Sequence, residues 1–205
     1  MAIPPNQLRV YSPQPGPDGE PVKVFSPLVV YGKAGRGLGK PSAEIRLAGQ
    51  EGGKPVPGEL ILFKEEPGGR HRWAILFEKL RRTPAGRTDQ LVISAQGLEK
   101  PQTIPLRIIP KDLTEPLITY PTSTDTVCAD YFIAYGGHDS TGLDVTGDLE
   151  VDGSSNGTIT EIRQTPRWVL EITGVSISAD SSGTLTVSVT ALASQPRTFT
   201  ITNCI

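Results

Sequence analysis

Two halves of this chain repeat each other, and this repeat limits the possible folds more than any other feature. Trp73 recurs as Trp168, each preceded by an arginine, and a proline follows each tryptophan after 28 residues, at Pro101 and Pro196. A repeat of about 100 residues has the size of one small domain. The 205 residues are therefore expected to form two related domains in tandem.

The repeat extends upstream of the tryptophans with a different offset. Residues 28–32 (LVVYG) match residues 132–136 (FIAYG) at an offset of 104, against 95 for the tryptophans. The first half therefore has about nine more residues in its middle loops, where insertions are tolerated best. We expect domain 1 to span residues 1–110, a linker to span residues 111–116, and domain 2 to span residues 117–205.

Short apolar segments separated by Gly and Pro predict an all-β fold. Leu185, Val187 and Val189 alternate with polar residues, which is typical of a half-buried strand. An apolar share of 37% fits strands that are buried on one face only. Seven such segments in each half are the pattern of a β-sandwich. The expected strands are 7–11, 22–31, 43–48, 59–64, 73–79, 90–95 and 103–109, then 117–120, 126–135, 148–152, 158–164, 168–172, 184–191 and 198–203.

The beginning of each half resembles bacterial immunoglobulin-like repeats, and more loosely fibronectin-like repeats. An opening strand is followed by Ser12-Pro13 in the first half and by Tyr120-Pro121 in the second, and the next strand ends in Tyr-Gly. The resemblance implies two tandem immunoglobulin-like β-sandwich domains. Modules of this kind serve as spacers, adhesins, sugar-binding accessories or decorations of phage particles. The family contributes no catalytic residues.

The two halves differ in charge. Residues 1–112 carry 17 Lys and Arg against 11 Asp and Glu, whereas residues 113–205 carry 3 Arg, no Lys and 11 Asp and Glu. Opposite charges on consecutive domains favour head-to-tail contact between copies of the chain, or contact between the two domains. The alternative is that the surface charge has drifted without a role.

The only two cysteines, Cys128 and Cys204, both lie in the second half. Their separation of 76 residues excludes the short spacings of metal or redox motifs. We expect a disulfide between them, with two buried thiols as the alternative. By the repeat, Cys128 corresponds to Val24, so the disulfide would replace an apolar contact. Cys204 has the strand parity of Thr202, however, so pairing inside the core would require a bulge.

Two clusters of charged residues are candidate sites. The basic residues Arg70, Arg72, Arg81 and Arg82 flank one predicted strand and are candidates for contact with an acidic partner. Nine residues of strand separate Arg72 from Arg81, which places them at opposite ends of the sandwich. The acidic residues of the second half could hold Ca²⁺ in loops, although plain turns are the alternative. These acidic candidates are Asp139, Asp144, Asp148 and Asp152.

The sequence favours a non-enzymatic protein. Its two histidines lie in different halves, away from the cysteines and from any paired carboxylates, so neither zinc nor a catalytic triad is expected. The basic residues are not interleaved with aromatic residues, so nucleic acid is not an expected partner. No apolar segment is long enough to cross a membrane. No cofactor is expected apart from the calcium considered above.

We therefore expect a structural or interaction protein that contacts other proteins, including copies of itself head to tail. As a tandem β-sandwich it would belong to a surface assembly, an adhesin or a particle. We expect it outside the cell or on the cell surface, or alternatively in a virion as a phage decoration or tail protein. The alternative function is a ligand-binding accessory module that recognises carbohydrate, with or without Ca²⁺.

Overall fold

The computed structural model describes residues 3–49, 54–110, 117–189 and 194–203. The chain divides into two compact units, a first unit Ala2–Lys111 and a second unit Asp112–Ile205. The predicted linker, residues 111–116, lies outside the described residues. Each unit is described below by itself.

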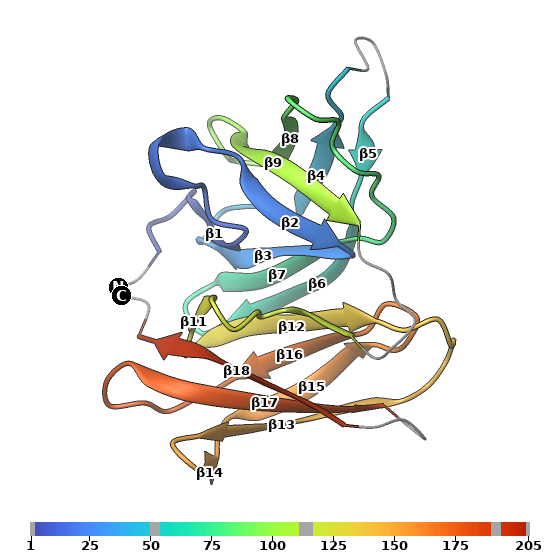
Figure 1. Ribbon diagram of the computed structural model, residues 1–205. Helices are drawn as coiled ribbons and strands as arrows, with labels where there is room; N and C mark the ends of the chain where they lie inside the picture. The colour runs from blue at the N-terminus through green and yellow to red at the C-terminus, as the bar shows by residue number, and fades with distance from the viewer. Residues whose placement is uncertain (1–2, 50–53, 111–116, 190–193, 204–205) are drawn as a thin grey trace. The chain divides into compact units, whose positions relative to one another are not determined.

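The first unit is a sandwich of two sheets (Figure 1). The four-stranded sheet has the order β1-β3-β7-β6 and the five-stranded sheet has the order β2-β9-β8-β4-β5. All neighbouring strands are antiparallel except β2 and β9, which are parallel. The strands are β1 (Leu8–Ser12), β2 (Val22–Ser26), β3 (Leu28–Ala34), β4 (Pro41–Arg46), β5 (Val56–Pro57), β6 (Glu59–Glu66), β7 (Arg70–Phe77), β8 (Asp89–Ala95) and β9 (Gln102–Pro110).

The second unit repeats this topology strand for strand. Its sheets have the orders β10-β12-β16-β15 and β11-β18-β17-β13-β14, and here too the one parallel pair, β11 with β18, is at the edge of the five-stranded sheet. The strands are β10 (Leu117–Tyr120), β11 (Thr126–Cys128), β12 (Tyr131–Gly137), β13 (Val145–Val151), β14 (Ser154–Ser155), β15 (Thr158–Arg163), β16 (Val169–Thr173), β17 (Ser181–Val189) and β18 (Gln195–Thr202).

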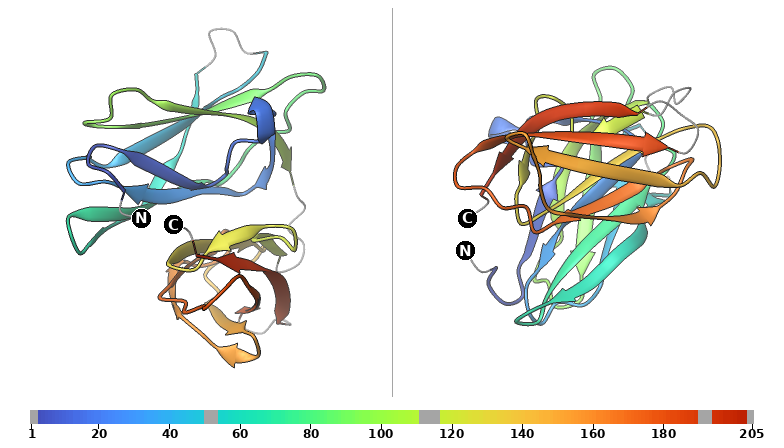
Figure 2. Two further views of the ribbon diagram at one scale, coloured as in Figure 1. Left: turned by 90° about the vertical axis from the view of Figure 1, so that its left-hand side faces the viewer. Right: turned by 90° about the horizontal axis from the view of Figure 1, so that it is seen from below.

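This arrangement confirms the predicted fold class. Two packed sheets with these strand orders, repeated along the chain, are tandem immunoglobulin-like β-sandwiches. In the left view of Figure 2 the two layers of the first unit are seen apart. The one helical element among the described residues is a 3-10 turn, Pro17–Gly19. No helix in the described part of the chain is long and apolar enough to cross a membrane.

Each of the two predicted strands 22–31 and 126–135 is in fact two strands. β2 and β3 belong to different sheets, and Pro27, which cannot donate a backbone hydrogen bond, lies between them. β11 and β12 are divided in the same way at Ala129 and Asp130. The chain therefore crosses from one sheet to the other within each of the predicted strands.

The two units also share irregularities of register. In the first unit the β1–β3 pairing passes from Val10 opposite Gly32 to Ser12 opposite Tyr31, and skips Tyr11. In the second unit the β10–β12 pairing skips Thr119 in the same way. A further shared bulge occurs between β6 and β7 and between β15 and β16. A bulge moves every following side chain relative to the faces of the sheet.

The core of each sandwich is built around its tryptophan. Trp73 and Trp168 are almost fully buried, and alternate residues beyond them face the same core. The expectation that strands are buried on one face only does not hold for β3 and β12, because every residue of these two strands is buried. Other buried core residues are Leu28, Val30, Ile45, Ile75, Phe77, Leu91 and Ile93 in the first unit, and Phe132, Leu149, Leu170, Ile172, Leu185, Phe199 and Ile201 in the second.

Candidate interaction surfaces

The outer face of the five-stranded sheet in the first unit carries exposed cations. In the parallel β2–β9 pair, Lys23 lies directly opposite Arg107. Both side chains are exposed, because they alternate with the buried Val24, Leu106 and Ile108. Neighbouring strands lie ~4.8 Å apart, so the two charges are adjacent on this face.

The same face also has an ion pair and apolar positions. Arg46 on β4 lies 2.9 Å from Glu44, measured from Nε to Oε1; the Arg46 side chain is exposed and that of Glu44 is half-buried. Phe25 lies opposite Ile109 beside the lysine–arginine pair, and both are half-buried. We call this surface, made of Lys23, Phe25, Glu44, Arg46, Arg107 and Ile109, the basic face.

The outer face of the five-stranded sheet in the second unit is covered with hydroxyl groups. Thr184 and Thr198 lie opposite each other on β17 and β18, with their Oγ1 atoms 3.1 Å apart. The hydroxyl of Thr202 donates a 2.6 Å hydrogen bond to the carboxylate of Asp180. The neighbouring strands β11 and β13 carry outward hydroxyls as well. On β11, β13, β17 and β18 the other outward hydroxyl-bearing residues are Thr126, Thr146, Ser182, Thr186, Ser188 and Thr200.

Two carboxylates complete this surface. Asp148 and Glu150 alternate on β13 with the buried Leu149 and Val151, and both are exposed. No lysine or arginine occupies an outward position of β11, β18, β17 or β13 among the residues that the structure describes. We call this surface the acidic face. It consists of the hydroxyl-bearing residues named above together with Asp148 and Glu150.

The four predicted basic interaction residues do not form one cluster. Arg70 and Arg72 lie at the start of β7, whereas Arg81 and Arg82 follow its end at Phe77. The guanidinium of Arg72 lies 3.4 Å from Glu66, and that of Arg81 donates a 3.3 Å hydrogen bond to the Ala48 carbonyl. Their role in binding an acidic partner stays a prediction, one that concerns two separate places.

The predicted calcium ligands are likewise dispersed. Asp139 and Asp144 lie in the loop between β12 and β13, Asp148 lies within β13, and Asp152 lies in the following turn with a φ of 51°. The carboxylate of Asp144 accepts a 2.8 Å hydrogen bond from Gln164. Among the described residues no three acidic, histidine or cysteine side chains form a group that could hold a metal ion. The calcium site stays a prediction without such a group to support it.

The predicted disulfide involves a residue outside the described part. Cys128 is half-buried at the end of β11. In the β11–β18 pair it lies opposite Thr202, two residues before Cys204, while the adjacent Val127 occupies the core. Cys128 therefore does not take the core position that the repeat assigned to it through Val24. Cys204 itself lies outside the described residues, and the bridge stays a prediction.

One serine motif that sequence reasoning missed has no catalytic setting. Residues 153–157 read GSSNG and match Gly-x-Ser-x-Gly, which in hydrolases bends a strand into a helix and exposes the serine. Here Ser155 lies on the two-residue strand β14, which pairs antiparallel with β13, and the next element is another strand. The motif is therefore part of a β-hairpin.

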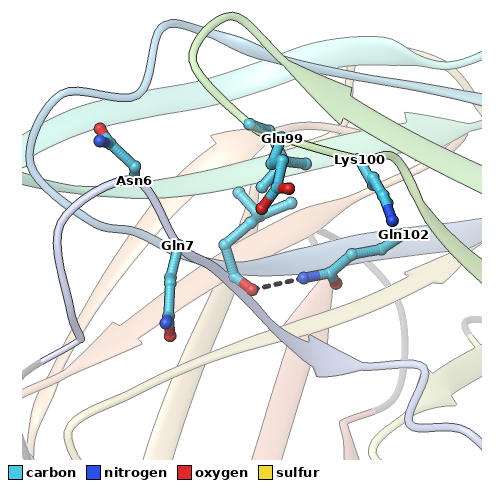
Figure 3. Close-up of a pocket in the computed structure, with 7 residues that line it drawn as sticks. Asn6, Gln7, Glu99, Lys100 and Gln102 are labelled. Carbon is cyan, nitrogen blue, oxygen red and sulfur yellow. Dashed lines mark hydrogen bonds between the residues drawn. The ribbon is translucent and has the colours of Figure 1, made fainter.

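An open pocket of about 310 Å³ lies at an end of the first unit's sandwich (Figure 3). The amide of Gln102 at the start of β9 donates a 2.6 Å hydrogen bond to the Leu8 carbonyl on β1, which links the two sheets. Asn6, Gln7, Glu99 and Lys100 also line the pocket. The one hydrogen bond between the residues drawn in Figure 3 joins the two sheets, which is a structural role.

No protein-family model matches the chain, and none of the curated proteins matches it. Among solved structures, the N-terminal two-immunoglobulin module of the Drosophila receptor protein tyrosine phosphatase DLAR is 17% identical, with a TM-score of 0.27, over 91% of this chain and 95% of that one. Dpr2 Ig1-Ig2, solved with DIP-Theta, is 10% identical, with a TM-score of 0.29, over 98% of this chain and 100% of that one.

A third solved structure is that of SGBP-B from the mixed-linkage glucan utilization locus of Bacteroides ovatus, in complex with a mixed-linkage heptasaccharide. It is 13% identical, with a TM-score of 0.31, and 97% of this chain covers 48% of that one. The chain thus spans about half the length of SGBP-B. Scores this low support no functional argument, and the fold assignment rests on the sheet order and register within each unit.

Proposed function

We propose that this chain is a non-enzymatic structural or interaction protein whose copies contact one another head to tail. The observation that supports this most directly is the difference between two equivalent sheets. The basic face of the first unit presents Lys23 and Arg107, and the acidic face of the second unit presents Asp148 and Glu150. Complementary charges on different units favour contact between the first unit of one copy and the second unit of another.

The proposal includes a setting as well as a contact. Repetition of a β-sandwich suits a component of a surface assembly, an adhesin or a particle, located outside the cell or on its surface, or in a virion. A disulfide between Cys128 and Cys204 would agree with an oxidising compartment. Carbohydrate recognition with calcium remains the alternative function, and no group of the described residues favours it.

The proposed function is tested by sedimentation velocity of the purified chain over a range of protein and salt concentrations. We expect species larger than the monomer at about 20 mM NaCl that dissociate towards about 500 mM, because salt screens exposed charges. A chain that stays monomeric at every salt and protein concentration would contradict the head-to-tail proposal.

A further inference from the structure

We propose that the basic face of one copy binds directly to the acidic face of the next copy, so that these two sheet faces form the head-to-tail interface. This inference rests on the function proposed above and adds the surfaces and residues that make the contact.

The four charges at the centre of the proposal are available for contact. Lys23, Arg107, Asp148 and Glu150 are all exposed. The ion pairs that join Lys33 and Arg72 to Glu66 and Arg46 to Glu44 involve none of these four side chains. An interface that brings the four together therefore leaves these three ion pairs intact.

The spacing of the charges is similar on both faces. Lys23 and Arg107 lie on adjacent strands, ~4.8 Å apart at the backbone. Asp148 and Glu150 are two residues apart on one strand, ~6.6 Å along β13. Because lysine and arginine side chains are long and have several rotamers, two cations and two carboxylates at these spacings can form two ion pairs at once.

The surroundings of the charges also fit each other. Next to its cations the basic face has the half-buried side chains of Phe25 and Ile109. Next to its carboxylates the acidic face has threonines, whose methyl groups can pack against apolar side chains while their hydroxyls form hydrogen bonds. Apolar contacts surrounded by polar groups are the usual composition of a protein interface.

The symmetry of such a contact has a consequence that can be measured. The two faces lie on different units, so the contact is heterologous, and each copy that binds leaves one face of each kind unoccupied. Association therefore continues until the copies close into a ring or grow as an open chain. A contact between two identical faces would stop at a dimer.

The experiment uses two charge-reversed variants of the full chain. The variant Lys23→Glu/Arg107→Glu has a reversed basic face, and the variant Asp148→Lys/Glu150→Lys has a reversed acidic face. All four positions are exposed, so each variant should keep the circular dichroism spectrum and melting temperature of the wild type. Under salt conditions where the wild type forms oligomers, we expect each variant alone to associate at least about tenfold more weakly.

A mixture of the two variants gives the decisive result. The first variant keeps an intact acidic face and the second keeps an intact basic face, and their two reversed faces are also opposite in charge. An equimolar mixture should therefore associate again, into oligomers in which the two variants alternate. A single chain with all four reversals should form oligomers again, because both faces then have exchanged signs. If the mixture does not associate although each variant keeps its fold, the assignment of the interface is wrong.

A matched control separates the face from net charge. Lys40→Glu/Lys100→Glu changes the charge of the first unit by the same amount, at exposed positions that precede β4 and β9. This control should associate like the wild type, and its loss of association would overturn the assignment. If the wild type associates but neither reversal weakens it, this inference fails and the proposed function stands. If the wild type never associates, the proposed function fails with it.

Discussion

Gly32 on β3 lies directly opposite Trp73 on β7. In the second unit Gly136 has the same relation to Trp168, whose carbonyl oxygen accepts a 3.1 Å hydrogen bond from the glycine N–H. A Cβ atom at Gly32 would collide with the backbone carbonyl of Arg9 on the neighbouring strand β1. Glycine at this position therefore allows β1 to approach β3.

Replacing Gly32 by alanine should destabilise the first unit by about 2–3 kcal/mol, because strand backbones must move to admit the methyl group. The measurement is hydrogen exchange followed by mass spectrometry, of β1 and β3 peptides for this variant and of β13 and β17 peptides for the comparison variant. Gly147→Ala is the comparison, since its Cβ would meet only side-chain ends, with Leu170 Cδ1 at 3.0 Å. A loss for Gly32→Ala no larger than that for Gly147→Ala would show that the backbone contact has little effect.

A buried polar network should be important for the stability of the first unit. The Thr83 hydroxyl donates a 2.5 Å hydrogen bond to the Asp89 carboxylate and accepts a 2.6 Å bond from the Ile108 N–H, and Asp89 also accepts from the Ala48 N–H at 2.7 Å. Asp89 is 1% exposed. Asp89→Ala should cost about 3 kcal/mol of unfolding free energy, because the amide of Ala48 loses this acceptor.

A double-mutant cycle with Thr83→Val tests whether these residues act together. The two effects should be less than additive, with a coupling of about 1 kcal/mol or more in urea unfolding. Thr103→Val is the control, because Thr103 is exposed on the neighbouring strand β9 and should change stability by less than about 0.5 kcal/mol. Fully additive effects would contradict the network.

The predicted disulfide can be checked by chemistry. Digestion without a reducing agent should release one peptide pair joined through Cys128 and Cys204, and reduction with alkylation should lower the stability of the second unit by about 4–5 kcal/mol. Recovery of both cysteines as free thiols from protein kept in air would contradict the prediction.

Calcium titration tests the predicted metal site. A ligand that binds only the folded state raises the melting temperature of the protein. We expect no change in melting temperature up to about 100 mM Ca²⁺, which is about 100 times the dissociation constant of a weak, millimolar calcium site. The control titration uses Asp144→Asn/Asp148→Asn. An increase in the wild type that this variant lacks would establish the site and favour the carbohydrate-binding alternative.

The sequence predicts the architecture well because apolar residues alternate along the strands and the pattern of strands recurs in the second half. Trp73 and Trp168 mark equivalent strands, and alternation along 184–189 identifies the buried side of β17. The two divided strands were harder to recognise. Pro27 signals the first break, but Ala129 and Asp130 carry no such signal, because the change of sheet there depends on long-range pairing with β18.

The candidate surfaces were less predictable than the fold. The net charge of each half is visible in the sequence, and alternation alone places Arg107 on the outer side of its strand. Sequence does not tell that Lys23 is its direct neighbour, because the β2–β9 pairing joins segments more than 80 residues apart. Closeness in sequence therefore favours the arginines around β7 as a candidate site, although they lie at different ends of that strand.

The two units have their bulges at equivalent places. A bulge cannot move along a strand by single substitutions, because each shift turns the whole following segment inside out. The skipped residues Tyr11 and Thr119 thus hold equivalent places in the two sandwiches. No packing constraint fixes the charges of the outer sheet faces, so the same sandwich can present cations in one unit and carboxylates in the other.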